Sequence, residues 1–354
     1  MNRAYLDAIA NAVLYEGYLL YPYRPSIKNH QRWTFGGLYP ESFCKAQKRG
    51  DASSQQTECL VLGTSATTLK IVVRFLHQMV RRVGAFDPPL SRWTNDAVPP
   101  LRLVEMLQIG SKRFYDWQEV REREVPLMDL APRDLCAFLL RRSFRFDGYR
   151  GLEPLQGPTG DVEGAFIRTQ QAIEGLIDVA AEEVEEGLFR LTTRVINHTP
   201  LKIAACISRD DVQKYAFLST HVILAVEHGE FISLMDPPER FAQAAAACNN
   251  IGAWPVLVGQ EGQKDTMLSS PIILYDYPQV APESPRDFFD GTEIDELLTL
   301  RIMTLTDEEK AAMASVDERG GALLRRTLGT ARESLSRLHG TVRGLPEASA
   351  EGQE

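Results

Sequence analysis

The clearest β-strand pattern in the chain is ECLVLGTSATTLKIVVRFL, residues 58–76. Glu58 to Leu62 and Thr68 to Leu76 are rich in Val, Ile, Leu and Thr, which pleated strands favour. Residues 63–67 between them contain Gly, Ser and Thr, a composition typical of a turn. The stretch therefore predicts two short strands that pair with each other.

Similar patterns recur in the second half of the chain. Ile173 to Val179 and Leu188 to Asn197 flank an acidic turn, and Val222 to Val226 and Glu230 to Leu234 flank His228-Gly229. Short apolar runs separated by turn residues predict antiparallel hairpins. Several strands between residues 165 and 235 at this spacing favour a sandwich-like arrangement.

Helical patterns lie at both ends of the chain. Residues 2–20 carry apolar side chains at helical spacing, and Asp236 to Glu239 is a helix start before the Ala-rich residues 241–248. Thr292 and Thr306 each open a capping box ahead of an apolar stripe. The expected fold is α+β, with antiparallel β-sandwich-like domains, an N-terminal helix and a helical C-terminal part.

Charge and composition suggest how the chain divides. Residues 1–150 carry 22 Lys and Arg against 15 Asp and Glu, whereas the remainder carries 17 against 33, for a net charge of -9. We expect a mildly basic N-terminal domain over 1–150, with a helix, an aromatic-cationic loop and strands. A β-rich domain that closes with α/β elements follows over 160–305, then C-terminal helices over 306–340 and a disordered acidic tail over 341–354.

Several function classes are excluded by what the sequence lacks. The five cysteines, Cys44, Cys59, Cys136, Cys206 and Cys248, form no closely spaced pair, which argues against a disulfide framework, a zinc knuckle or an iron–sulfur site. The chain shows no signal peptide pattern, no apolar run long enough to span a membrane and no nucleic-acid reader motif. We therefore expect a cytoplasmic protein without a cofactor, membrane insertion or nucleic-acid partner.

One candidate binding segment is YPYRPSIKNHQRWTFGGLYP, residues 21–40. Planar guanidinium groups beside Tyr and Trp suit recognition of a carboxylate-bearing or aromatic partner surface. The alternative is that the rings cover a sheet edge while the cations extend into water. The candidate partner-binding residues are Tyr23, Arg24, Lys28, His30, Arg32 and Trp33.

Two enzyme-like patterns are weaker. The carboxylates Asp276, Asp287, Asp290 and Glu293 could hold a hard cation for a metal-dependent hydrolase. Acidic residues in a first helical turn, however, usually face water and complement the helix dipole, so no metal is favoured. Ser and His occur near each other in residues 219–221 and 269–270, but no Gly-x-Ser-x-Gly elbow frames them. A small-molecule pocket beside residues 275–289 is a further alternative.

Four segments carry a resemblance to a known family. They are residues 249–310, from NNIGAWPVLVG to LTDEEK, together with TECLV from Thr57, residues 21–40 and GEFISLMDPPE from Gly229. The chain resembles an uncharacterised bacterial family whose genes tend to lie in nickel–iron hydrogenase clusters. The resemblance implies an accessory or assembly role beside a hydrogenase subunit or maturation factor. With no complete catalytic constellation in the sequence, we expect a non-catalytic protein that acts by binding another protein.

Overall fold

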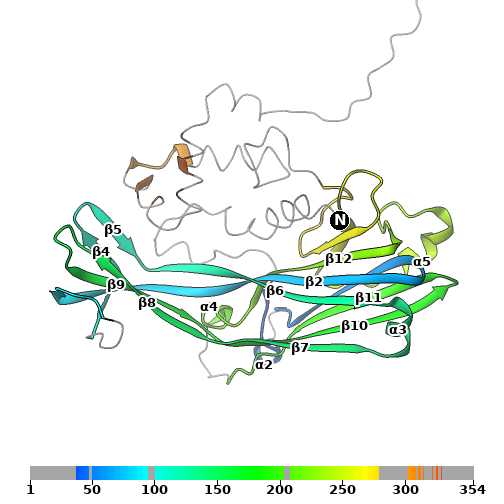
Figure 1. Cartoon of the computed structure of the whole chain (residues 1–354), viewed down its shortest axis with the longest axis horizontal. Helices are drawn as coiled ribbons and strands as arrows, with labels where there is room; N and C mark the ends of the chain where they lie inside the picture. The colour runs from blue at the N-terminus through cyan, green and yellow to red at the C-terminus, as the bar shows by residue number, and fades with distance from the viewer. Residues whose placement is uncertain are drawn as a thin grey trace, which may run out of the picture.

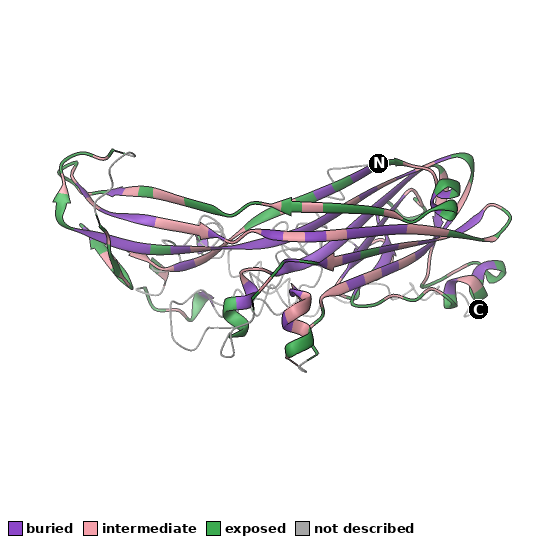
Figure 2. Cartoon of the chain, turned by 90° about the horizontal axis from the view of Figure 1, so that it is seen from below, coloured by how far each residue is buried: buried purple, intermediate pink, exposed green. Residues whose placement is uncertain are grey.

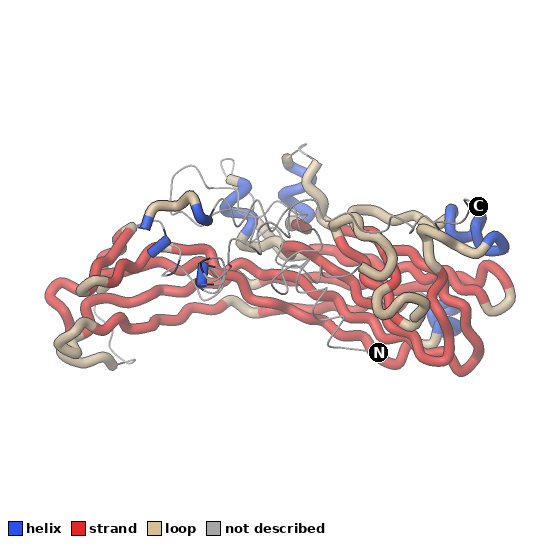
Figure 3. Tube along the Cα trace, turned by 90° about the horizontal axis from the view of Figure 1, so that it is seen from above, coloured by secondary structure: helices blue, strands red, loops and turns tan. Residues whose placement is uncertain are grey.

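The computed structural model of the chain is dominated by one antiparallel β-sheet (Figure 1). It describes residues 37–47, 50–94, 100–202, 208–278 and 302–307, together with 310, 311, 314, 321, 324, 325 and 328. Twelve strands join this sheet, and β4 and β5 form a separate two-stranded ribbon. The strands run along the length of the molecule, and the short helices lie at its margin (Figure 3).

The sheet is organised around β2 (Ser54–Leu90), a single strand of 37 residues. Its first part pairs with β11 (Leu188–Asn197) on one edge and β12 (Phe217–Ile232) on the other. Its second part pairs with β6 (Trp117–Leu130) and β9 (Val162–Gln170). Because each partner satisfies only one section of the β2 backbone, the strand links both halves of the sheet.

The remaining elements extend this frame. The other strands of the sheet are β1 (Gly37–Leu38), β3 (Arg102–Val104), β7 (Leu140–Phe146), β8 (Tyr149–Gln156), β10 (Ile173–Glu185), β13 (Trp254–Leu257) and β14 (Thr266–Ser270), and the ribbon is β4 (Met106–Ile109) with β5 (Lys112–Tyr115). The helices are α2 (Glu41–Ala46), α3 (Pro132–Ala137), α4 (Arg209–Gln213), η1 (Glu239–Phe241) and α5 (Ala242–Ala246). Among the residues described, no helix has the length and apolar character needed to cross a membrane.

The main core lies where the sheet curls over itself. Bands of buried and exposed residues alternate along the strands, as expected when one face is covered (Figure 2). Phe75 of β2 stacks on Phe217 of β12 at a ring distance of 4.6 Å and meets Phe146 of β7 edge-on at 6.1 Å. Ile177 of β10 and Leu191 of β11 are buried in the same cluster. Strands from both flanks of β2 therefore share one apolar interior.

Two hairpins expected from the sequence are absent, because each expected turn is a bulge within a continuous strand. Residues 58–62 and 68–76 lie end to end in β2, and β12 continues through His228. The register shifts between Glu227 and Gly229 opposite residues 63–67. Turn-forming residues serve such a bulge as well as a hairpin, since both need unusual backbone angles; His228 has a φ of 56°.

The expected α+β class with sandwich-like domains and a helical C-terminal part is wrong. The described elements are mainly antiparallel strands of one sheet, and the last of them is β14. The error has a physical cause: residues 63–67 have the composition of a turn and so predict two strands, whereas they form a bulge within the single strand that joins the others. The expected N-terminal helix, residues 2–20, lies outside the described residues. The expected boundary between 150 and 160 falls at the β8–β9 hairpin, whose strands belong to the same sheet.

Two local predictions are confirmed. Residues 173–179 and 188–197 pair as neighbouring antiparallel strands, β10 and β11. The helical segment after Asp236 is present as η1 and α5. In each case the signal depends on neighbours in sequence, either an apolar alternation around a turn or a helix start.

The bulge rests on one hydroxyl, which makes it testable. Thr67 Oγ1 accepts a hydrogen bond from Thr64 N at 2.7 Å and donates one to His228 O at 2.6 Å. Thr67→Val removes both bonds while keeping the side-chain shape, so we expect the free energy of unfolding to fall by about 1–3 kcal/mol. Thr68→Val is the matched control and should change it by less than about 0.5 kcal/mol. Urea unfolding measures both; equal losses would contradict the role of the Thr67 hydroxyl.

Candidate functional site

Beyond Phe75, the inner face of the sheet changes from apolar to cationic. Side chains directly opposite in an antiparallel pair project from the same face. The register places His77 opposite Arg121 and Arg81 opposite both Trp117 and Arg168. We call this region the arginine–aromatic face, formed by His77, Arg81, Glu119, Arg121, Arg123, Phe146, Tyr149, Glu153, Phe166, Arg168 and Gln170.

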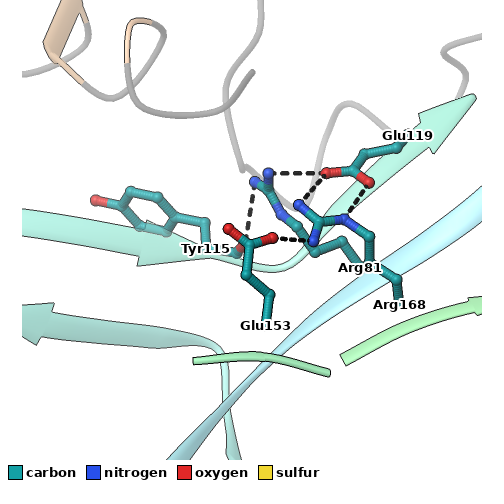
Figure 4. Close-up of polar contacts among 5 residues, drawn as sticks. All are labelled: Arg81, Tyr115, Glu119, Glu153 and Arg168. Atoms are coloured by element: carbon teal, nitrogen blue, oxygen red, sulfur yellow. Dashed lines mark hydrogen bonds and ion pairs between the residues drawn. The ribbon is translucent and has the colours of Figure 1, made fainter. Parts of the chain in front are cut away.

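The centre of the face is an ion-pair network of Arg81, Glu119, Glu153 and Arg168, whose residues come from β2, β6, β8 and β9 (Figure 4). Arg81 Nη1 donates to Glu119 Oε1 at 3.0 Å, and Arg168 Nε donates to Glu119 Oε2 at 2.7 Å. Arg168 Nη1 also donates to Glu153. Glu119 thus lies between two guanidinium groups, and Arg168 between two carboxylates, so each charge has an opposite neighbour.

Burial makes this network rigid. The Arg81 side chain is nearly fully buried, and its guanidinium carbon lies 4.4 Å from the centre of the Phe166 ring. Burial lowers the pKa of Arg81 from its ordinary value, and the Glu119 carboxylate offsets this only in part. Arg81 remains charged at neutral pH and depends on Glu119 for compensation.

A second pair of cations on the face has no such compensation. Arg121 lies 5.3 Å from the centre of the Tyr149 ring, and Arg123 lies 4.5 Å from that of Phe146. Arg123 Nη2 donates to Gln170 Oε1 at 2.9 Å, and Arg123 Nε is buried without a partner. Within the described part of the chain, neither arginine forms an ion pair with a carboxylate. Burial lowers the pKa of Arg123, and repulsion from Arg121 lowers it further.

His77 lies buried beside these two arginines. Its side chain is fully buried, and the backbone groups of Lys214 and Gln171 lie close to the ring. Burial lowers its pKa to about 4, and the charges of Arg123 and Arg121 act in the same direction. The imidazole is therefore neutral at pH 7, and an added positive charge at this position is strongly disfavoured.

A buried serine and histidine meet elsewhere, but their arrangement is structural. Ser270 Oγ lies 3.2 Å from His221 Nε2, and His221 Nδ1 lies 2.7 Å from Ser219 O. Both side chains are fully buried, and Ser270 Oγ also accepts a hydrogen bond from Ile272 N. A backbone carbonyl orients the imidazole where a hydrolase triad has a carboxylate. The pair joins β12 to β14 in the interior.

The residues predicted to bind a partner or a metal fall mostly outside the described part of the chain. These are Tyr23, Arg24, Lys28, His30, Arg32 and Trp33, and the carboxylates Asp287, Asp290 and Glu293. Asp276 is described, and its two oxygens accept hydrogen bonds from Ser233 Oγ and Leu257 N. Both bonds fasten its loop to the sheet. No group of three His, Cys, Asp or Glu side chains that could hold a metal occurs within the described residues.

An open pocket of about 410 Å³ lies near α2 and the segment after β11, away from residues 275–278. His198, Thr199 and Lys202 contribute to its lining. Thr199 Oγ1 accepts a hydrogen bond from Glu174 N and donates one to Glu174 O. The Thr199 hydroxyl, the most buried polar group of the pocket lining, therefore has both of its hydrogen bonds within the protein. The pocket carries less binding potential than the arginine–aromatic face.

The arginine–aromatic face was missed by sequence reasoning. Its residues come from β2, β6, β7, β8 and β9, and the most distant two, His77 and Gln170, are 93 positions apart in sequence. One local signal was available in WQEVREREV, residues 117–125, where Glu119, Arg121 and Arg123 alternate with the apolar ends Trp117 and Val125. This alternation places charged side chains on the face that also carries the core residues.

Loss of the central carboxylate tests the network. Glu119→Gln leaves two guanidinium groups without their shared partner in a site where the Glu119 side chain is only 16% exposed. We expect the free energy of unfolding to fall by about 1–3 kcal/mol. Glu227→Gln removes the partner of Lys70 at a side chain that is 57% exposed, and should cost less than about 1 kcal/mol. Urea unfolding followed by tryptophan fluorescence compares them, and similar costs would argue against the buried network.

The burial of His77 predicts an acid-dependent loss of stability. Unfolded histidine binds a proton near pH 6.5, whereas folded His77 binds one only near pH 4, so the unfolded state holds more protons between these values. Stability therefore falls as the pH drops through this window. In His77→Leu the loss between pH 7 and pH 4.5 should be about 2 kcal/mol smaller than in the wild type. His198→Leu, at an exposed position, is the control; parallel curves for His77→Leu and wild type would exclude the effect.

Comparison with known proteins leaves the function to be argued from this geometry. No protein-family model matches the chain, and no curated protein gives a significant sequence match. The feature of the described structure with the most unused binding capacity is the pair of uncompensated arginines on the arginine–aromatic face.

Proposed function

We propose that this chain is a non-catalytic binding protein that recognises another protein through its arginine–aromatic face. The observation that carries the proposal is that Arg121 and Arg123 are held against aromatic rings without an opposing carboxylate in the described structure. Arginine and tyrosine are enriched among residues that dominate the energy of protein interfaces. A surface that already holds these groups in place loses little conformational entropy on binding.

The neighbouring network supports this use of the face. Arg81, Glu119, Arg168 and Glu153 compensate one another and lie beside the exposed Arg121 and the partly buried Arg123. Arg121 and Arg123 are not needed for this compensation, and they retain hydrogen-bond donors for a partner. The face therefore combines a rigid base with unused cationic groups, as a preorganised binding surface does.

The chain as a whole is acidic, with a net charge of -9, so the cationic patch is local. Long-range repulsion disfavours nucleic acid, whereas short-range pairing at the patch suits a protein with acidic groups. We place this activity in the cytoplasm, as expected from the sequence. A hydrogenase subunit or maturation factor is the first partner to test, because of the resemblance described above. The segment with Tyr23, Arg24, Arg32 and Trp33 remains a second proposed contact.

Site-specific cross-linking in the native host tests the proposal. A photoreactive phenylalanine analogue replaces Tyr149, which is 44% exposed on the face, or Tyr275, which is 80% exposed and lies on the segment after β14. We expect a discrete protein adduct from position 149 and none from position 275, because only the former lies beside the uncompensated arginines. Mass spectrometry identifies the adduct.

The two positions also provide the opposing outcome. If both positions give adducts of the same partners at the same yield, the cross-links reflect random collision. If a folded variant gives no adduct from position 149, the face is not an interface. Circular dichroism and tryptophan fluorescence establish that both variants are folded.

A further inference from the structure

The two uncompensated arginines have a defined spacing. Arg121 and Arg123 are two residues apart on β6, so their side chains leave the same face with their Cα atoms roughly 7 Å apart. Acidic residues two positions apart in an extended segment have the same spacing, so carboxylates of such a segment match the two guanidinium groups one to one.

The contacts of these arginines leave donors available. An arginine has five N–H donors. Arg123 uses one of them on Gln170, and none of the hydrogen bonds among the described residues involves the Arg121 guanidinium. Stacking on Tyr149 and Phe146 occupies the face of each guanidinium group and leaves its edge for paired hydrogen bonds to a carboxylate. The available groups are therefore those that recognise carboxylates.

The surroundings of the pair make an anion favourable. The two cations repel each other, and His77, fully buried beside them, is neutral and supplies no negative charge. Arg81, on the same face, is already paired with Glu119. A carboxylate between Arg121 and Arg123 would relieve their repulsion and supply the charge that the described structure does not provide.

We propose that the partner of the arginine–aromatic face presents an extended acidic segment whose alternate carboxylates bind Arg121 and Arg123. This inference rests on the proposed protein-binding function and names the chemistry that the partner presents. Arg121 is exposed and makes the first contact, while Arg123 is partly buried and orders the segment against Phe146. The attraction depends on charge, so it weakens as the salt concentration rises.

A labelled short peptide that alternates Glu and Thr serves as the probe for the full chain. Fluorescence anisotropy should show binding at low salt, with at least roughly tenfold weaker affinity for Arg121→Gln plus Arg123→Gln. The control is Arg102→Gln plus Arg133→Gln, which removes the same charge from two other exposed positions and should change affinity less than about twofold. A peptide that alternates Gln and Thr should not bind.

Other outcomes overturn the inference. Equal binding by the two double variants would show that net charge, and not this site, attracts the peptide. Displacement of the peptide by an equal concentration of inorganic phosphate would indicate a site for any small anion. If the variant at the partly buried Arg123 does not fold, Arg121→Gln alone should still weaken binding several-fold, and unchanged affinity would contradict the proposal. A cross-link from position 149 that persists in Arg121→Gln plus Arg123→Gln would remove the carboxylate contact while leaving the protein-binding function in place.

Discussion

The backbone pairing of β2 is the constraint on which the rest of the structure depends. This strand provides hydrogen-bonding partners for β3, β6, β9, β11 and β12, so its N–H and C=O groups are satisfied along both edges by segments far apart in sequence. No other described strand pairs with so many others. The positions of the side chains on β6, β8 and β9 in the arginine–aromatic face are therefore set, directly or through one neighbour, by register on β2.

The same strand also relates stability to function. Up to Phe75 its inward side chains enter the main apolar cluster, and from Val83 they enter a second cluster with Ile109 and Phe166. The polar residues His77 and Arg81 lie between these two clusters. Apolar packing on each side keeps His77 and Arg81 in place. This section of β2 would be poorly stable alone, because a desolvated arginine needs a carboxylate held in a fixed position beside it.

Sequence patterns predicted the strands at 173–197 and the helical segment after Asp236, because these depend on residues close together in the chain. They failed at residues 63–67 and 228–229, where a pair of opposing bulges has the composition of two turns. Whether a segment rich in Gly and Thr forms a turn or a bulge depends on the strand with which it pairs. For the same reason the binding face was not predicted, since Arg121 and Tyr149 are brought together only by the curl of the sheet.

The length of β2 has a consequence for biosynthesis. The strand ends at Leu90, but β9 begins at Val162 and β12 only at Phe217. As the polypeptide leaves the ribosome, Ile71 and Val73 at the centre of β2 must wait for much of the chain to be translated before β12 can cover that edge. An apolar strand exposed for this interval is prone to self-association. The strand therefore has to stay free of such contacts until its last neighbour has been translated.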